Sequence, residues 1–120
     1  MTCLTEQGDF IVSTRCDEKN NNQKWAIGYH AGTSSYRIFS LRVKGKVADR
    51  DSSKDTELQI WKSHDRNNQR ITMHKIETNV YSIIIEDDCL HVKNNNKADN
   101  APLDFTKCRD DRSHRWRISY

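Results

Sequence analysis

The sequence contains little of what most other classes of protein require. Proline occurs once, glycine four times, and only 34% of the 120 residues are hydrophobic. No apolar run approaches the ~18 residues of a membrane-spanning helix, and the first residues lack the charged-then-apolar layout of a signal peptide. The net charge of +3 is mild, and basic and acidic residues are interspersed, so no nucleic-acid footprint appears. We expect one small domain, residues 1–120, with no nucleic-acid partner and no membrane span.

Patterns that carry acid–base or metal chemistry are also absent from the sequence. No close C-x-x-C pair occurs, and the five histidines show no metal-ligand spacing. No paired carboxylates, catalytic triad or phosphate-binding loop stands out. We therefore expect a binding module with no metal and no cofactor, and not an enzyme. Met1 is expected to be a start residue added before a domain excised from a longer protein.

The chain does contain an internal repeat of about 45 residues. Trp25, Ile71 and Trp116 are spaced by 46 and 45 positions, and Tyr36 and Tyr81 are 45 apart. A third set of landmarks is spaced by 44 and 42 positions: Cys3-Leu4, Val47-Ala48 and Cys89-Leu90. Self-similarity at a fixed period is the signature of a repeat architecture. We therefore divide the chain into three repeats, approximately 1–30, 31–76 and 77–120.

Each repeat has the pattern of short strands, because apolar and polar residues alternate with a period of two and Asn, Asp, Ser and Gly clusters separate the runs. The expected strands are 2–6, 9–14, 24–29, 36–43, 46–50, 57–62, 70–76, 80–86, 89–92, 102–108 and 115–120. The first repeat has no counterpart of 36–43, so its opening strand is missing or lies upstream. One repeat cannot bury its apolar face alone. We therefore expect one shared core, with Trp25, Ile71 and Trp116 at equivalent positions in it.

The four cysteines follow the same repeat. Cys3 and Cys16 bracket the second and third strands of the first repeat, and Cys89 and Cys108 bracket those of the third. The middle repeat has no cysteine at either position. We expect Cys3–Cys16 and Cys89–Cys108 disulfides, which indicate an oxidising compartment and hence a secreted or extracellular protein.

Five side chains of the middle repeat suit a neutral sugar. They comprise one carboxylate, three amides and one indole: Asp49, Gln59, Trp61, Asn68 and Gln69. An aromatic face can cover the apolar C–H side of a pyranose, while carboxylate and amide groups hydrogen-bond its hydroxyls. This inventory suits acid–base or metal chemistry poorly.

A Gln-x-aromatic pattern also recurs before the last strand of each repeat. Asn22-Gln23-Lys24-Trp25 has the full pattern, Asn68-Gln69-Arg70-Ile71 keeps the Gln, and Ser113-His114-Arg115-Trp116 keeps the Trp. With three copies at this period, the whole chain resembles the ricin-type (R-type) lectin family. The resemblance implies an all-β β-trefoil fold. It also implies binding to galactose or N-acetylgalactosamine on the glycans of glycoproteins or glycolipids.

The family's pocket uses an Asp ending the second strand, a Gln and an aromatic residue on the third, and an Asn-Gln before the fourth. Carried onto this chain, the complete set occurs only in the middle repeat, as Asp49, Gln59, Trp61, Asn68 and Gln69. In the first repeat Thr5 and Thr14 replace the Asp and the aromatic residue. The third repeat departs at every position: His91, Asp104, Thr106, Ser113 and His114. The resemblance therefore implies one working site, in the middle repeat.

Plainer readings exist for these residues. Asp49 also reads as a turn acid, Trp61 as a rim aromatic covering the core, Asn68 as a loop residue, and Gln69 as a brace for its own loop. Two other functions remain open: a trefoil that contacts proteins as an inhibitor or scaffold, and a reader of sulfated glycans. The second is motivated by a basic group: Arg37, Arg42, Lys44, Lys46 and Arg50. We also expect the domain to belong to a larger multidomain or multimeric protein, because a single sugar site binds weakly.

Overall fold

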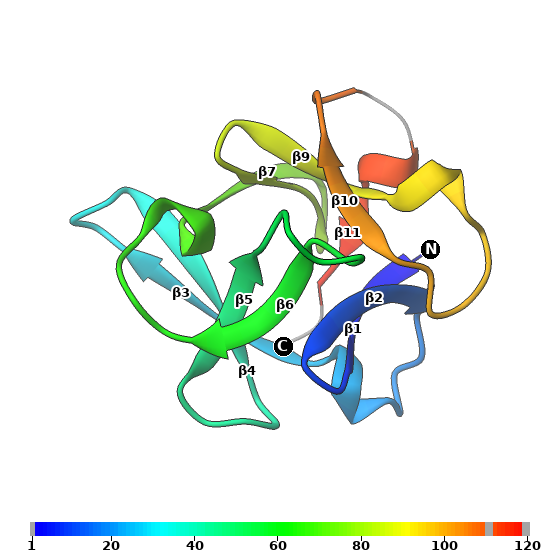
Figure 1. Ribbon diagram of the computed structural model, residues 1–120, viewed down its shortest axis with the longest axis horizontal. Helices are drawn as coiled ribbons and strands as arrows, with labels where there is room; N and C mark the ends of the chain where they lie inside the picture. The colour runs from blue at the N-terminus through cyan, green and yellow to red at the C-terminus, as the bar shows by residue number, and fades with distance from the viewer. Residues whose placement is uncertain (1, 110–111, 119–120) are drawn as a thin grey trace.

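The computed structural model describes residues 2–109 and 112–118, and Figure 1 shows its arrangement of strands. The strands in these residues are β1 (Thr2–Gln7), β2 (Phe10–Arg15), β3 (Trp25–His30), β4 (Ser35–Ser40), β5 (Lys46–Arg50), β6 (Leu58–Lys62), β7 (Ile71–Glu77), β8 (Val80–Ile85), β9 (Asp88–Val92), β10 (Leu103–Thr106) and β11 (Trp116–Arg117). Each of the eleven expected strands is present. Met1 and the last two positions of the expected strand 115–120 lie outside the described residues.

The strand expected at 36–43 ends early, at Ser40. The Ser40 hydroxyl accepts hydrogen bonds from the backbone N–H of Arg42 at 3.2 Å and of Val43 at 2.9 Å. A serine that bonds the backbone two and three residues ahead stabilises a turn in place of a sheet ladder. The alternation of apolar residues continues past this point, so the pattern alone overestimated the strand.

Three hairpins repeat the same pairing. They are β1–β2, β5–β6 and β9–β10, with Thr5 opposite Val12, Asp49 opposite Gln59, and His91 opposite Asp104. The other strands form a second antiparallel series, in which β3 pairs with β4, β4 with β7, β7 with β8, and β8 with β11. In Figure 1 hairpin β5–β6 lies between β3 on the left and hairpin β1–β2 on the right. The hairpin registers therefore align the three repeats residue by residue.

The first repeat begins at β1, and no counterpart of β4 or β8 precedes it in the described residues. The strands β4 and β8 each pair with the last strand of the repeat before them. By the same rule an opening strand of the first repeat would lie between β11 and β3. Within the described part of the chain β3 pairs with β4 alone, while β11 pairs in parallel with β1 at Cys3 and Arg117.

One apolar cluster draws on all three repeats. Trp25, Ile71 and Trp116 are at most 1% exposed and belong to it, as expected for equivalent core positions. The two indoles also make equivalent hydrogen bonds: Trp25 Nε1 donates to the Leu4 carbonyl at 3.1 Å, and Trp116 Nε1 to the Leu90 carbonyl at 3.2 Å. A buried indole N–H needs such a partner. The expectation of a shared core is confirmed.

Both expected disulfides are present. Cys3 is bonded to Cys16, and Cys89 to Cys108, across sequence separations of 13 and 19 residues. Each bridge ties the start of a hairpin to the segment that follows it. The middle hairpin closes without a bridge, and Val47, which takes the place of Cys3 and Cys89, is fully buried.

We predict that loss of either disulfide lowers the free energy of unfolding by about 2–4 kcal/mol, because loops of these lengths regain conformational freedom in the unfolded chain. The paired replacements Cys3→Ser with Cys16→Ser and Cys89→Ser with Cys108→Ser, compared by urea unfolding, test this value. Reductant should destabilise the unmodified chain and should leave a variant lacking all four cysteines unchanged. Equal stability with and without reductant would contradict the prediction.

Candidate functional site

Hairpin β5–β6 positions three of the five predicted binding residues. Asp49 on β5 lies directly opposite Gln59 on β6, and Val47 lies opposite Trp61. Opposed residues point to the same face of a sheet, as do residues two apart along a strand. Asp49, Gln59 and Trp61 therefore share one face of the hairpin.

Asn68 and Gln69 reach the same carboxylate from a single 3-10 turn, η2 (Asn67–Gln69). Gln69 Nε2 donates to Asp49 Oδ2 at 2.8 Å, and Asn68 Nδ2 donates to the same oxygen at 3.1 Å. Gln59 Nε2 donates to the other oxygen, Oδ1, at 3.2 Å. The structure thus joins four of the five predicted residues in one hydrogen-bonded cluster centred on Asp49.

Burial explains why this cluster is needed. The Asp49 side chain is 3% exposed, and a buried carboxylate is costly unless donors surround it. The three amides supply those donors. A solvated turn acid, the plainer reading of Asp49, is excluded by this burial. Asp49 forms the floor of the site, with the amides arranged around it.

The cluster presents mainly hydrogen-bond acceptors to a ligand. A carboxylate has about four acceptor positions, and the three amides occupy three of those on Asp49, leaving one at Oδ1. Both N–H groups of the Asn68 amide are used, on Asp49 and on the Arg50 carbonyl. Those of Gln59 face Asp49 and, at a longer 3.5 Å, Asp51. Within the described part of the chain the amide oxygens of Gln59 and Asn68 accept no hydrogen bond, so they suit hydroxyl donors.

His64 belongs to the site and was not among the predicted residues. Its Nε2 lies 3.6 Å from Asp49 Oδ2, and its Nδ1 accepts the backbone N–H of Arg66 at 3.2 Å. Because Nδ1 is an acceptor, the neutral ring carries its proton on Nε2, facing the carboxylate. The side chain is 29% exposed. His64 has no counterpart in the Gln-x-aromatic pattern, so no motif in the sequence pointed to it.

Trp61 supplies the open face of the site. The indole is 48% exposed, whereas Trp25 and Trp116 are buried. Its equivalents by hairpin register are Thr14 and Thr106, which lie opposite Cys3 and Cys89 as Trp61 lies opposite Val47. Trp61 does not belong to the buried apolar cluster. Its large apolar face is therefore available to a ligand beside the Asp49 cluster.

Gln69 also braces its own loop. Its amide oxygen accepts the His64 backbone N–H at 2.8 Å, and its Nε2 donates to the Lys62 carbonyl at 3.0 Å. Gln23 makes the same pair of contacts in the first repeat, with the N–H of Asp17 and the carbonyl of Arg15, both at 2.8 Å. The brace is therefore common to two repeats. The additional bond from Gln69 to a carboxylate occurs in the middle repeat.

In the outer repeats the equivalent polar groups bond to one another. In the first, the hydroxyls of Thr5 and Thr14 are in contact, and Gln23 Nε2 donates to Thr14 Oγ1 at 2.9 Å. In the third, His91 Nδ1 lies 2.6 Å from Asp104 Oδ1, and His91 Nε2 lies 3.0 Å from Asn95 Oδ1. His91 and His114 are 5% and 1% exposed. Neither cluster combines an open aromatic face with a carboxylate held by amides.

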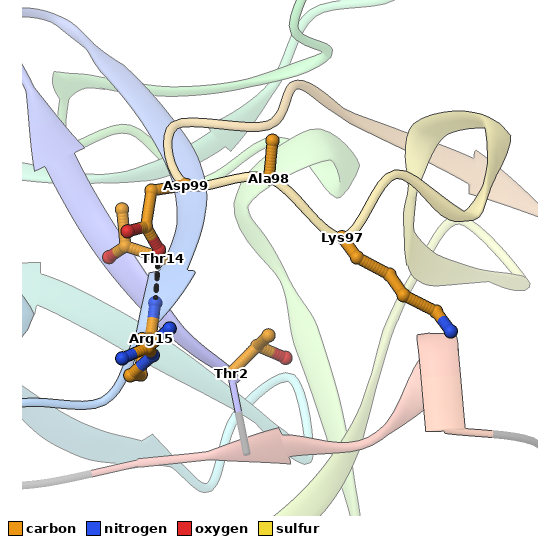
Figure 2. Close-up of a pocket in the computed structure, with 6 residues that line it drawn as sticks. All are labelled: Thr2, Thr14, Arg15, Lys97, Ala98 and Asp99. Atoms are coloured by element: carbon orange, nitrogen blue, oxygen red, sulfur yellow. Dashed lines mark hydrogen bonds between the residues drawn. The ribbon is translucent and has the colours of Figure 1, made fainter.

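An open cavity of about 290 Å³ lies away from the five predicted binding residues, between hairpin β1–β2 and the loop before β10 (Figure 2). Its lining residues are Thr2, Thr14, Arg15, Lys97, Ala98 and Asp99. The Arg15 backbone N–H donates to Asp99 Oδ1 at 2.9 Å on its wall. The cavity has no aromatic lining, and it contains none of the five predicted residues. The candidate site is instead the face of hairpin β5–β6 that carries the exposed Trp61 and the buried Asp49 cluster.

The basic group that motivated a sulfated-glycan reader is largely engaged by acids. Arg37 Nη2 lies 3.0 Å from Asp65 Oδ1, and Arg50 Nη2 lies 3.1 Å from Asp88 Oδ2. Arg42 and Lys46 each lie 3.7 Å from a carboxylate oxygen, of Glu6 and Asp9 respectively. These contacts neutralise most of the group, so they do not favour a sulfate site.

Two further classes of site were sought in the described residues. No group of three or more His, Cys, Asp or Glu side chains there could hold a metal ion. No helix in that part of the chain is long and apolar enough to cross a membrane.

The strand pairing, with three equivalent hairpins over one core, is that of a β-trefoil, an all-β class.

No protein-family model and no curated protein matches the sequence. Among solved structures, a mosquitocidal holotoxin matches with a TM-score of 0.82 and 20% identity over 98% of this chain. The designed 3-fold symmetric protein ThreeFoil matches with a TM-score of 0.79 and 15% identity, over 99% of this chain and 91% of that one. A GlcNAcα1-4Gal releasing endo-β-galactosidase from Clostridium perfringens matches at 0.67 and 10%, over 94% of this chain and 27% of that one.

These likenesses show the fold, which is a β-trefoil. This chain spans 16% of the holotoxin chain and nearly all of the designed protein.

We predict that Gln69→Ala costs more stability than Gln23→Ala. Each change removes three hydrogen bonds of a buried amide and should lower the free energy of unfolding by about 1–3 kcal/mol. The loss is larger at Gln69 because the partner there is the buried carboxylate of Asp49, and hydrogen bonds to charged groups are the stronger kind. Urea unfolding of both variants tests the order. An equal or larger loss in Gln23→Ala would show that the Gln69–Asp49 bond adds nothing.

Asp51 borders the site through its long contact with Gln59. The pKa of Asp51 lies below the ordinary value, first because the Ser53 hydroxyl donates to Oδ1 at 2.6 Å. The Ser53 backbone N–H donates to the same oxygen and lowers the pKa further. A pKa lowered by folding favours the folded chain above the ordinary Asp pKa, and this contribution disappears as the pH falls through the lowered value. We predict that Ser53→Ala raises the pKa of Asp51, measured by NMR titration of its carboxyl carbon. Ser52→Ala is the matched control and should leave that pKa unchanged; no rise in Ser53→Ala would contradict the assignment.

Proposed function

We propose that the chain is a carbohydrate-binding lectin domain related to the R-type lectins, and that it binds galactose- or N-acetylgalactosamine-type glycans at one site in the middle repeat. The site comprises Asp49, Gln59, Trp61, Asn68 and Gln69. The observation that carries the proposal is the convergence of three amides on a buried carboxylate beside a half-exposed indole.

The proposed mode of binding follows from the groups that face solvent. Trp61 covers the apolar C–H face of one pyranose ring. Sugar hydroxyls donate to the amide oxygens of Gln59 and Asn68 and to the remaining acceptor position on Asp49 Oδ1. The five side chains of the proposed site, a carboxylate, three amides and an indole, suit hydrogen bonding and stacking, so we propose binding without reaction.

Two features support a secreted domain of a larger protein. The Cys3–Cys16 and Cys89–Cys108 bridges need an oxidising compartment to form and persist. A shallow site for one sugar gains useful strength when several copies act together. The match to a short part of the long holotoxin chain is compatible with such an arrangement.

Fluorescence of Trp61 provides the test, because the other two indoles are buried. Titration with galactose, N-acetylgalactosamine and lactose should shift the emission, and the shift should saturate. Trp61→Ala should weaken binding, measured by calorimetry or glycan array, by about tenfold or more, since one stacked ring contributes about 1.4 kcal/mol or more. Thr106→Ala is the matched control, because Thr106 is the equivalent of Trp61 in the third repeat.

Two results would contradict this function. The first is that none of the three sugars shifts the Trp61 emission and that Trp61→Ala gives the same glycan-array signal as the unmodified chain. The second is a sugar bound with full affinity by Trp61→Ala and lost in Thr106→Ala, which would move the site to an outer repeat. A protein partner whose binding is unaffected by lactose would favour the protein-interaction module instead.

A further inference from the structure

Phe10 is an exposed aromatic residue that the core does not use. It is 40% exposed and lies outside the buried apolar cluster. It begins β2, immediately after the turn at Gly8 and Asp9. By hairpin register its equivalents in the other repeats are Glu57 and Pro102, which are not aromatic. An aromatic ring at this position is thus peculiar to the first repeat.

The pairing of β2 with β6 places Phe10 beside the candidate site. Phe10 lies directly opposite Gln59, which in turn lies opposite Asp49. The backbone N–H of Ile60 donates to the Asp9 carbonyl at 2.8 Å next to this pair. Phe10 and Gln59 are therefore a non-hydrogen-bonded pair, the closer kind, with Cα atoms about 4.5 Å apart and side chains on one face. One row of side chains crosses three strands: Asp49, Gln59 and Phe10.

Trp61 lies two residues beyond Gln59 on the same face of β6. This makes Trp61 a diagonal neighbour of Phe10, at a separation of about 7–8 Å that large aromatic side chains can bridge. The two exposed rings, 40% and 48% accessible, thus flank the Gln59 amide on a surface made by two repeats. Asp9 and Lys46 lie 3.7 Å apart at neighbouring positions, so their charges offset each other there.

We propose that Phe10 and Trp61 form one extended sugar-binding surface, so that the preferred ligand is an oligosaccharide of at least two rings and not a monosaccharide. One ring lies against Trp61 over the Asp49 cluster, and the adjacent ring lies against Phe10. The inference rests on the proposed function and adds to it the ligand's size and a residue of the neighbouring repeat.

The chemistry of the surface favours this occupant over a protein. A contiguous exposed apolar patch larger than a few hundred Å² marks a protein-interaction surface, whereas here a polar amide separates two single rings. Sugars present small apolar C–H faces bordered by hydroxyls, and that alternation matches a ring, an amide and a second ring. A protein partner remains one outcome of the test.

The test compares galactose with three galactose-terminated disaccharides: lactose, N-acetyllactosamine and melibiose. Calorimetry on the unmodified chain should show at least one disaccharide binding about fivefold or more tightly than galactose, the gain expected from one added aromatic contact. Phe10→Leu should abolish that gain and leave the galactose affinity within about twofold. Phe10→Tyr, which keeps the flat ring, should retain the gain. Tyr29→Ala is the matched control, because Tyr29 is 60% exposed on β3, outside this surface.

The outcomes separate this inference from the function on which it rests. If galactose binds but no disaccharide exceeds it, or if the gain survives in Phe10→Leu, the extended surface is wrong and the single-ring site stands. If galactose and every disaccharide fail to bind, both are wrong. A protein ligand that is lost in Phe10→Leu and unaffected by all four sugars would assign the surface to protein contact. Far-UV circular dichroism of each variant checks that it is folded. If Phe10→Leu does not fold, Phe10→Tyr is used instead, and loss of the disaccharide gain in that variant contradicts the extended surface.

Discussion

The three repeats bury their apolar faces in one shared cluster, and the rest of the structure depends on that sharing. Trp25, Ile71 and Trp116 are equivalent members of the cluster, and all are excluded from solvent. Exchange of an indole for an isoleucine is tolerated in the middle repeat because the same core is filled from the other two sides. Since the core is collective, the polar residues on the outer faces of the hairpins are not needed to fill it. The hairpins are therefore free to differ on their outer faces.

The buried charge of Asp49 then determines how the middle repeat differs from the others. A carboxylate that is 3% exposed must be surrounded by donors, and the amides of Gln59, Asn68 and Gln69 meet that need. Their N–H groups are thereby turned inward, and the oxygens of Gln59 and Asn68 are left as acceptors. In the outer repeats the Thr14 hydroxyl accepts from the Gln23 amide and the His91 ring bonds to Asp104 and Asn95, so the same scaffold leaves less for a ligand. The acceptor character of the candidate site is thus a consequence of one buried charge.

Much of this arrangement could be predicted from the sequence, because period, strand alternation and paired cysteines are local patterns. All expected strands and both disulfides are present, and the strands ending at Ser40, Thr106 and Arg117 are shorter than their patterns. The burial of Asp49 was not predictable, because an acid in a polar stretch reads the same whether solvated or enclosed. His64 was missed because its role depends on where a loop returns to the hairpin. Whether the five candidate residues bind a sugar stays a prediction.

Phe10 shows a further limit of comparing repeats with one another. Alignment places Phe10 in the first repeat and the candidate site in the second, so the two have no relation in sequence. In the structure β2 pairs with β6, so hairpin β5–β6 is bordered by a strand of the preceding repeat. The surface next to the Asp49 cluster is consequently built by two repeats, and its character is set by whichever residue the first repeat supplies. A candidate site in this fold therefore depends on the contact between neighbouring repeats as well as on the residues of one repeat. Two repeats that both have the complete set of five binding residues can differ in the ligand they prefer, because their neighbouring repeats supply different residues.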